Sequence, residues 1–258
     1  MRDLHIMSSG PAAGVPLLML HGFGGSGAAW DAVIAAMPDT IRTIAVDLPG
    51  HGESLDAEGR GGAGRMAKAI LAGCDQAGIG EFHLAGHSMG GAVAALIAMR
   101  VGTRVKSLTL VAPGGMAKEI NAGLLARYAK AATVDEIRAC LEEMSAPGFL
   151  PSPQAIDRFV ADRARSGALA ALDETYQAMF PDGPGNGQGV LPGDALAALA
   201  MPVRVIWGDT DTVLTCPQPG HLPANFELEV LAGRGHMLPE EAPDVLARAL
   251  AAAVAHDG

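Results

Sequence analysis

The segment from Glu81 to Arg100, EFHLAGHSMGGAVAALIAMR, constrains the fold of this chain more than any other. An apolar strand pattern leads into Gly86-x-Ser88-x-Gly90, and an alanine-rich helical pattern follows at once. At a tight strand-to-helix turn the central residue is strained, and side chains two residues to either side would collide with neighbouring backbone. The pattern therefore predicts a serine at the end of a buried strand with its hydroxyl projecting from the sheet.

A serine hydroxyl is a weak nucleophile until a base takes its proton, so a histidine and an orienting carboxylate are expected downstream. His236 lies between a strand pattern, FELEVLAG, and a helix pattern, PEEAPDVLARALAAAVA, which predicts a position at the rim of a sheet. The strand pattern PVRVIWG ends in a turn with two carboxylates, Asp209 and Asp211, and either is a candidate acid. His87 is expected to point away from Ser88, to the opposite side of the chain, and to pack or form a hydrogen bond nearby.

The stretch HGFGGSG, residues 21–27, contains the G-x-G-x-x-G spacing of dinucleotide-binding loops. A strand pattern precedes it, a helix pattern follows it, and Asp47 stands about 20 residues beyond, where a ribose-binding carboxylate is expected. However, Asp47 is followed by LPGHGES, a sharp turn rather than a direct run into a crossover helix. We therefore prefer the serine motif as the functional signal and expect no cofactor.

Strand and helix patterns alternate up to Ala112, and residues 113–193 then read as helices and irregular loops. We expect a core formed by residues 1–112 and 194–258, with 113–193 inserted as a helical lid over the strand ends. The residues predicted to line a substrate pocket are Gly22, Met116, Phe149, Phe180 and Met237. Met144 and Phe159 are further apolar candidates, and for each residue of the insertion packing against the core is the competing interpretation.

The sequence resembles the α/β-hydrolase family through HGFGGSG, DLPGHGES, GHSMGG, WGDTD and GRGHM, in the family's order and across nearly the whole chain. The resemblance implies an α/β-hydrolase fold, with a mostly parallel twisted sheet, helices on both faces and a lid inserted after the sixth strand. It also implies Ser88, Asp211 and His236 as the catalytic residues, because the family's acid usually stands three residues after the glycine that ends the strand. The implied oxyanion hole consists of the backbone N–H groups of Phe23 and Met89.

Within that family, GHSMGGAVAALIA and LVAPGGMAKEINAGLLARY are similar to the hydrolase-like domain of the acetyltransferase component of acetoin dehydrogenase complexes. Such components generally join this domain to a lipoyl domain, which we do not expect here, since all lysines lie in helix or strand patterns of the hydrolase body. We therefore expect a stand-alone serine hydrolase, similar to esterases, that cleaves a small carboxylic ester or related acyl substrate. An acyltransferase, a carbon–carbon bond hydrolase of aromatic degradation and a non-catalytic binding module are the alternatives.

The net charge and the cysteine spacing indicate which classes of binding partner to expect. A net charge of −10 and a pI near 5.2 argue against nucleic acid and anionic membrane surfaces, so a small-molecule substrate is expected. The three cysteines are widely separated and show no metal-ligand spacing, which favours reduced thiols, a cytoplasmic location and no metal. The first residues, MRDLHIMSSGPAAG, contain no signal-peptide core. A monomer or a homodimer is expected.

Overall fold

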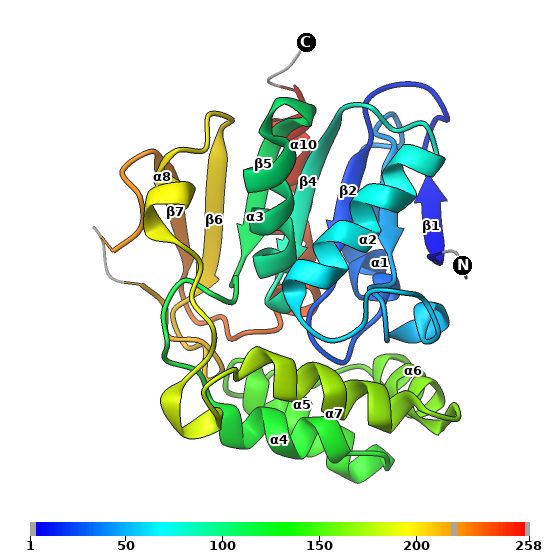
Figure 1. The fold of residues 1–258 in the computed structure, drawn as a ribbon. Helices are drawn as coiled ribbons and strands as arrows, with labels where there is room; N and C mark the ends of the chain where they lie inside the picture. Colours follow the sequence, from blue (N-terminus) through cyan, green and yellow to red (C-terminus); the bar gives the residue numbers. More distant parts are fainter. Residues whose placement is uncertain (1–3, 218–220, 256–258) are drawn as a thin grey trace.

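The computed structural model describes residues 4–217 and 221–255. Its centre is a seven-stranded sheet with the order β1-β3-β2-β4-β5-β6-β7. Strand β1 runs antiparallel to β3, and all other neighbours are parallel (Figure 1). The strands are β1 (Ile6–Ser9), β2 (Leu17–Leu20), β3 (Thr43–Val46), β4 (Phe82–His87), β5 (Val105–Val111), β6 (Val203–Gly208) and β7 (Phe226–Leu231). The mostly parallel sheet predicted from the sequence is confirmed.

The central strands are short apolar runs because both of their faces are covered. Every residue of β2 (LLML), β3 (TIAV) and β4 (FHLAGH) is buried. Strand β7, at the edge of the sheet, reads FELEVL and is only partly buried. The centre of the sheet therefore forms the core of the molecule, and the strand that ends at the serine turn runs through that core.

Helices cover both faces of the sheet (Figure 1). One face carries α2 (Ala63–Gln76), α3 (Met89–Val101) and α8 (Gly193–Ala197), and the other carries α1 (Asp31–Ala35) and α10 (Pro243–Ala255). Helix α3 is the alanine-rich helix predicted after Ser88, and it packs on β4 and β5. Its residues Ala94, Ala95 and Ala98 are buried, so their small side chains allow the helix to approach the sheet closely.

Between β5 and β6 the chain forms four further helices, which lie together beyond the carboxyl ends of the strands (Figure 1). They are α4 (Ala122–Lys130), α5 (Val134–Met144), α6 (Pro153–Ala164) and α7 (Ala168–Met179). Local sequence fixes where two of them begin: Thr133 and Glu136 form a capping box at α5, and Ser152 caps α6. The insertion follows the fifth strand of the described chain, not the expected sixth, because a single strand, β1, precedes β2.

The direction in which the sheet grows changes next to β2. From β2 the chain passes to β3 on one side and then to β4 on the other side, so β2 and β4 are neighbours at a topological switch point. In open α/β sheets, ligands bind in the crevice outside the carboxyl ends of the strands at such a point. The loop after β2 contains the glycine-rich stretch, and the turn after β4 contains Ser88. The topology therefore brings the two glycine-containing motifs to the same edge of the sheet.

The burial of β4 predicts a large effect of truncating its core side chains. Leu84 is 1% exposed, so Leu84→Ala should lower the free energy of unfolding by about 2–5 kcal/mol, through lost burial and the cavity left behind. Leu150→Ala is the matched control, because Leu150 is 73% exposed and its truncation should change stability by less than about 0.5 kcal/mol. Urea unfolding followed by circular dichroism measures both. Equal losses in the two variants would contradict the central position of β4.

Candidate active site

Ser88 occupies the turn between β4 and α3 with φ of 53° and ψ of −120°. A positive φ is costly for a residue with a side chain, and among the described residues only one other non-glycine residue, Ala112, has one. The Ser88 N–H donates to the Val111 carbonyl at 2.9 Å, and the Ser88 carbonyl accepts from Gly91 and Gly114 N–H groups, also at 2.9 Å. Hydrogen bonds to the neighbouring strand and loop therefore hold the strained backbone in place.

The glycines on either side of Ser88 are required by close backbone contacts. A Cβ at Gly86 would lie 2.3 Å from the Gly90 carbonyl oxygen, and a Cβ at Gly90 would lie 2.4 Å from the Leu20 carbonyl oxygen. Both distances are far shorter than any van der Waals contact, so a side chain at either position would push β4, β2 and α3 apart. The steric explanation predicted for the G-x-S-x-G pattern is confirmed.

His236 lies in the loop between β7 and the short helix α9 (Leu238–Glu241). Its Nε2 is 2.9 Å from Ser88 Oγ, and its Nδ1 is 2.8 Å from Asp211 Oδ2. With the proton assigned to Nδ1, the imidazole donates to the carboxylate and accepts from the serine hydroxyl. The side chains of His236 and Asp211 are 4% and 0% exposed, so the hydrogen bond between them is shielded from water.

The structure distinguishes the two candidate acids. Asp211 Oδ1 accepts the N–H groups of Val213 and Leu214, both at 2.8 Å, and Oδ2 accepts the Trp207 indole N–H at 3.1 Å as well as the His236 ring. Four donors therefore fix one buried carboxylate behind the imidazole. Asp209 is exposed, and its Oδ1 accepts the Gly233 N–H at 2.7 Å. The side chain brought to His236 is thus that of Asp211.

His87 lies beside His236, so the expectation that it points to the opposite side of the chain is wrong. Its Nε2 donates to the His236 carbonyl oxygen at 2.8 Å, and the two ring centroids are 5.0 Å apart. The expectation assumed that the alternation of a strand continues through the turn, but β4 ends at His87. Burial, and then the neighbouring His236, lowers the pKa of His87 to about 3, so this ring is a neutral donor at pH 7.

The glycine-rich loop after β2 is held in shape by the protein itself. His21 Nδ1 donates to the Gly22 carbonyl at 2.7 Å, its Nε2 accepts the Leu48 N–H at 2.9 Å, and burial lowers its pKa. Asp47 accepts the Gly27 N–H at 2.7 Å and the Glu53 N–H at 2.8 Å. The Asp47 carboxylate is therefore engaged by backbone of the loop and of the following turn, as a structural residue is, instead of facing a ribose.

Phe23 and Met89, the expected oxyanion-hole residues, flank the serine from the two glycine motifs. Met89 is the first residue of α3, where backbone N–H groups have no partner within the helix. Phe23 follows Gly22, and a Cβ on Gly22 would lie 3.2 Å from Ser88 Cβ. The loop after β2 therefore passes close enough to Ser88 for its backbone to reach a group attached to Ser88 Oγ.

A small cavity of about 30 Å³ adjoins Ser88 and His236. The core contributes the glycine loop and the histidine loop, including the predicted pocket residues Gly22 and Met237. The insertion contributes four apolar side chains, from α4, α5 and α6, and these are Leu125, Tyr128, Met144 and Phe159. Residues from the two halves of the core and from the insertion therefore enclose the serine together.

Residues 17–249 match the alpha/beta hydrolase family. The chain belongs to this family. A curated relative, the dihydrolipoyllysine-residue acetyltransferase component of the acetoin cleaving system of Cupriavidus necator, is 32% identical over 86% of the chain. The match covers 58% of that relative, so the chain spans about three fifths of its length.

Solved structures of similar fold include two enzymes of different chemistry. A meta-cleavage product hydrolase from Pseudomonas fluorescens has a TM-score of 0.83 and 22% identity, with 99% of this chain and 95% of the other covered. A carboxylesterase from Bacillus subtilis has a TM-score of 0.81 and 22% identity, with 99% and 88% covered. At this identity the comparison establishes that the chain has the α/β-hydrolase fold.

In this alpha/beta hydrolase, three of the predicted pocket residues lie away from the Ser88 cavity. Met116 lines a separate cavity of about 480 Å³ beside Trp207. Phe180 is buried against Tyr176, with ring centroids 4.9 Å apart, and Phe149 is half-buried in the segment between α5 and α6. Which face of an inserted helix meets the core depends on packing between distant segments, and the apolar character of a residue does not show it.

Sequence analysis did not identify the two residues that α4 contributes to the cavity, Leu125 and Tyr128. The signal was present in principle, because NAGLLARYAK has apolar residues three positions apart on one helical face. Leu124, one position earlier, is fully buried elsewhere in the core. A shift of one residue turns a side chain by about 100° around a helix, so periodicity alone leaves the facing residue undetermined.

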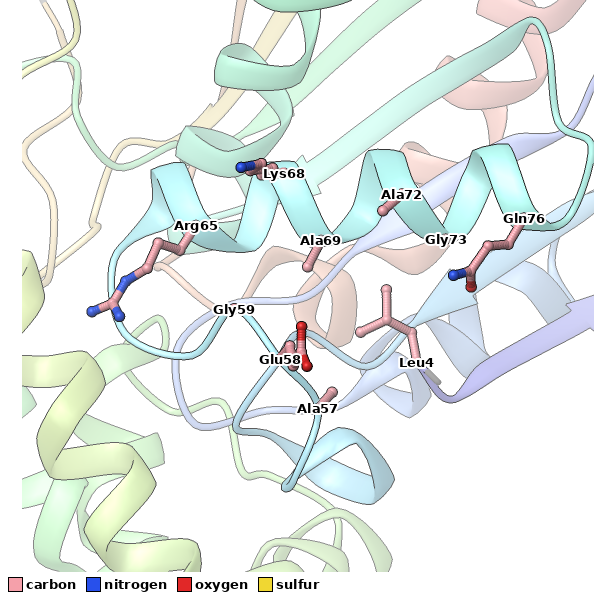
Figure 2. A pocket seen from close by; sticks show the side chains of 10 residues that line it. All are labelled: Leu4, Ala57, Glu58, Gly59, Arg65, Lys68, Ala69, Ala72, Gly73 and Gln76. Carbon is pink, nitrogen blue, oxygen red and sulfur yellow. The ribbon is translucent and has the colours of Figure 1, made fainter. Parts of the chain in front are cut away.

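Another cavity lies away from the side chains of Ser88 and His236. Figure 2 shows the cavity of about 340 Å³ between Leu4 and helix α2, with the charged side chains of Glu58, Arg65 and Lys68. None of its lining residues lines the Ser88 cavity.

Among residues 4–217 and 221–255, no three His, Cys, Asp or Glu side chains gather as a metal site, and no helix has the length and apolarity needed to cross a membrane.

The contacts at Gly90 predict opposite effects for two Gly→Ala substitutions. Gly90→Ala places a Cβ against the Leu20 and His21 carbonyls and should destabilise the protein by more than about 3 kcal/mol or prevent folding. At Gly123, near the start of α4, the atom nearest to an added Cβ is Asn121 Oδ1 at 3.8 Å, so Gly123→Ala should be neutral or stabilise by up to about 1 kcal/mol. Thermal unfolding compares them, and a stable Gly90→Ala protein would refute the steric argument.

Proposed function

We propose that this protein is a serine hydrolase that cleaves a small carboxylic ester or related acyl substrate through Ser88, His236 and Asp211. The observation that carries the proposal is the continuous hydrogen-bonded chain from Ser88 Oγ to His236, at 2.9 Å, and from His236 to Asp211, at 2.8 Å. Nucleophile, base and orienting acid in hydrogen-bond reach are the requirements of nucleophilic catalysis. Their order along the chain, Ser then Asp then His, is that of hydrolases with this turn.

In the proposed mechanism Ser88 Oγ attacks the acyl carbon while His236 Nε2 takes the hydroxyl proton. Asp211 stabilises the resulting imidazolium through the Nδ1–H hydrogen bond. His236 then gives the proton to the alcohol oxygen as the ester bond breaks. The alcohol departs, and the acyl group stays bound to Ser88. Water, deprotonated by His236, attacks the acyl-enzyme and releases the carboxylic acid, and the proton returns to Ser88.

The negative charge that develops on the acyl oxygen needs hydrogen-bond donors. We assign this role to the backbone N–H groups of Phe23 and Met89, on the support of their positions beside Ser88 in the loop after β2 and at the start of α3. Such a donor typically contributes about a hundredfold or more to the rate. His87 and His21 are neutral because burial lowers the pKa of both, so neither adds a competing cation beside His236.

The acyl group is proposed to be short. The cavity at Ser88 has a volume of about 30 Å³, and its walls include Leu125, Tyr128 and Phe159. A space of this size holds about one water molecule, so a longer acyl chain requires these side chains to move. We propose that residues 113–193 act as a lid domain whose α4, α5 and α6 set this limit, and that the core comprises residues 1–112 and 194–258.

Acyl transfer is the second candidate, and the named activity of the Cupriavidus necator relative favours it. The same acyl-enzyme would then pass its acyl group to a thiol in place of water. Carbon–carbon bond hydrolysis is supported only by the similarity of fold to the meta-cleavage product hydrolase. A thiol acceptor that outcompetes water would identify acyl transfer. Turnover of a dienoate without turnover of simple esters would identify carbon–carbon bond hydrolysis.

The proposal also covers the setting of the enzyme. A small-molecule substrate and a cytoplasmic location are supported by the net charge of −10 and by Cys74, Cys140 and Cys216, which are free thiols. Burial raises the pKa of Cys74 to about 11, so this thiol is unreactive at neutral pH.

A chain-length series of activated esters tests the function. With 4-nitrophenyl esters from acetyl to octanoyl, kcat/KM should be highest for the shortest acyl groups and at least about tenfold lower for octanoyl, because the cavity is small. Ser88→Ala should lower kcat/KM by at least about a thousandfold on every ester and abolish labelling by a fluorophosphonate. If Ser88→Ala keeps ester turnover and labelling, the proposed function is wrong.

The assignment of the acid is tested by a matched pair of substitutions. Asp211→Asn should lower kcat by about a thousandfold to ten-thousandfold, since an amide cannot hold His236 in the tautomer with the proton on Nδ1. Asp209→Asn removes one charge two residues away, keeps an acceptor for the Gly233 N–H and should change kcat by less than about threefold. Steady-state kinetics on the best ester compares them, and the reverse order of effects would assign the role to Asp209.

A further inference from the structure

A second buried carboxylate, that of Glu241, lies directly behind the histidine loop. Glu241 is the last residue of α9 and is 5% exposed. Its Oε2 accepts the Gly235 N–H at 2.8 Å and the Ala146 N–H at 3.1 Å, and its Oε1 accepts the Met237 N–H at 3.0 Å. Gly235 and Met237 are the two neighbours of His236 in the chain. One carboxylate therefore binds the backbone on both sides of the proposed base.

The third donor, Ala146, belongs to the insertion, just beyond the end of α5. The histidine loop and this segment approach closely, because a Cβ on Gly235 would lie 2.4 Å from the Ala146 nitrogen. The His236 N–H itself donates to the Met144 carbonyl at 2.8 Å. The backbone around His236 is thus attached to the end of α5 at two points, and Glu241 forms one of them.

The contact chemistry requires a carboxylate. Both Glu241 oxygens face N–H donors, and three donors converge on the group. A glutamine has one acceptor oxygen, so its NH₂ group would face a backbone N–H, donor against donor. Hydrogen bonds to an ionised acceptor are also about twice as strong as those between neutral groups. A near-isosteric Glu→Gln change therefore removes the function of the group while it keeps the volume.

The neighbouring Glu240 provides a contrast within the same helix. Its Oε2 is buried and has no hydrogen-bond partner among the described residues. Burial, and then the charge of Glu241, raises the pKa of Glu240 to about 7. Of the two adjacent carboxylates, that of Glu241 accepts from the backbone of the histidine loop, and Oε2 of Glu240 does not.

We propose that Glu241 is a positioning residue for His236: its carboxylate fixes the backbone of Gly235 and Met237 against Ala146, so that the imidazole stays in line between Ser88 and Asp211. The inference rests on the proposed function, since it assigns to Glu241 an effect on the step in which His236 takes the serine proton. It also makes the end of α5, in the insertion, a part of the catalytic geometry.

The test compares Glu241→Gln with Glu240→Gln in the full chain. Glu241→Gln should lower kcat on the best 4-nitrophenyl ester by on the order of 10–100-fold, because a misplacement of about 1 Å has that effect, and leave KM within about twofold. The rate of fluorophosphonate labelling should fall by a similar factor, since labelling also needs the activated serine. Glu240→Gln should change kcat and the labelling rate by less than about twofold.

A double substitution separates positioning from a general structural defect. In a His236→Ala background, Glu241→Gln should change the residual labelling rate by less than about twofold, because its effect acts through the imidazole. An additional loss as large as in the wild-type background would overturn the proposal, and so would a Glu241→Gln protein with normal kcat and only a lower melting temperature.

If Glu241→Gln does not fold, Glu241→Asp takes its place with the same readouts, since it keeps the charge but is shorter by one methylene. Should neither variant fold, Glu241 is a folding residue and the proposal is wrong. Ser88→Ala is measured in parallel to keep the two ideas apart. Normal turnover in Ser88→Ala contradicts the proposed function, whereas an inactive Ser88→Ala beside a fully active Glu241→Gln contradicts the positioning role alone.

Discussion

The close backbone contact at the end of β4 is the constraint on which the rest of the site depends. Ser88 has a φ of 53° in a turn where the backbone packs closely around Gly86 and Gly90. The turn can form because these two residues have no side chains, for which there is no space. The cost of a strained non-glycine residue is of order 1–3 kcal/mol, and a well-packed core of buried strands can bear it. Because β4 lies beside β2 at the switch point, the same strand end brings Ser88 to the glycine loop. Strain, sheet order and proximity to the loop are consequences of one packing arrangement.

Electrostatics around the serine follow from burial. His21, His51 and His87 all have pKa values lowered chiefly by burial, to about 3 for His51 and His87, so these rings are neutral at physiological pH. Each ring donates one hydrogen bond to a backbone carbonyl, whereas the buried Nε2 of His51 has no partner among the described residues. These three rings therefore add no positive charge to this part of the molecule.

How far the sequence predicts this molecule depends on whether a feature is local. The turn at Ser88 is encoded by adjacent residues, and the sequence predicts it. The starts of α5 and α6 are also encoded locally, by the caps that the structure shows at Thr133 and Ser152. The residues alone left Asp209 and Asp211 open, and the family resemblance favoured Asp211. The coordinates add that the Asp211 carboxylate is buried behind the imidazole and that Asp209 is exposed. The cavity walls were the least predictable, since Leu125 and Tyr128 depend on how α4 is rotated against the core. The contact between Glu241 and Ala146 could not be predicted from the sequence either, because the two residues are distant in the chain.

The insertion is hydrogen-bonded to the loops that carry Asp211 and His236, and these bonds limit how it could move in the lid role proposed for it. Thr212, next to Asp211, donates its hydroxyl to the Glu143 carbonyl, and His236 donates its N–H to the Met144 carbonyl. The end of α5 is therefore bonded to the acid loop and to the histidine loop, and a rigid-body opening of the whole insertion would break both. Helices α4 and α6, which also line the cavity, are bonded to the core as well. The Asn121 N–H at the start of α4 donates to the Val213 carbonyl at 2.9 Å, and Arg158 of α6 donates to the Ala28 carbonyl at 2.8 Å. A larger space beside Ser88 can therefore come from rotation of side chains such as Tyr128 and Phe159, which leaves the hydrogen bonds from Ser88 to Asp211 intact.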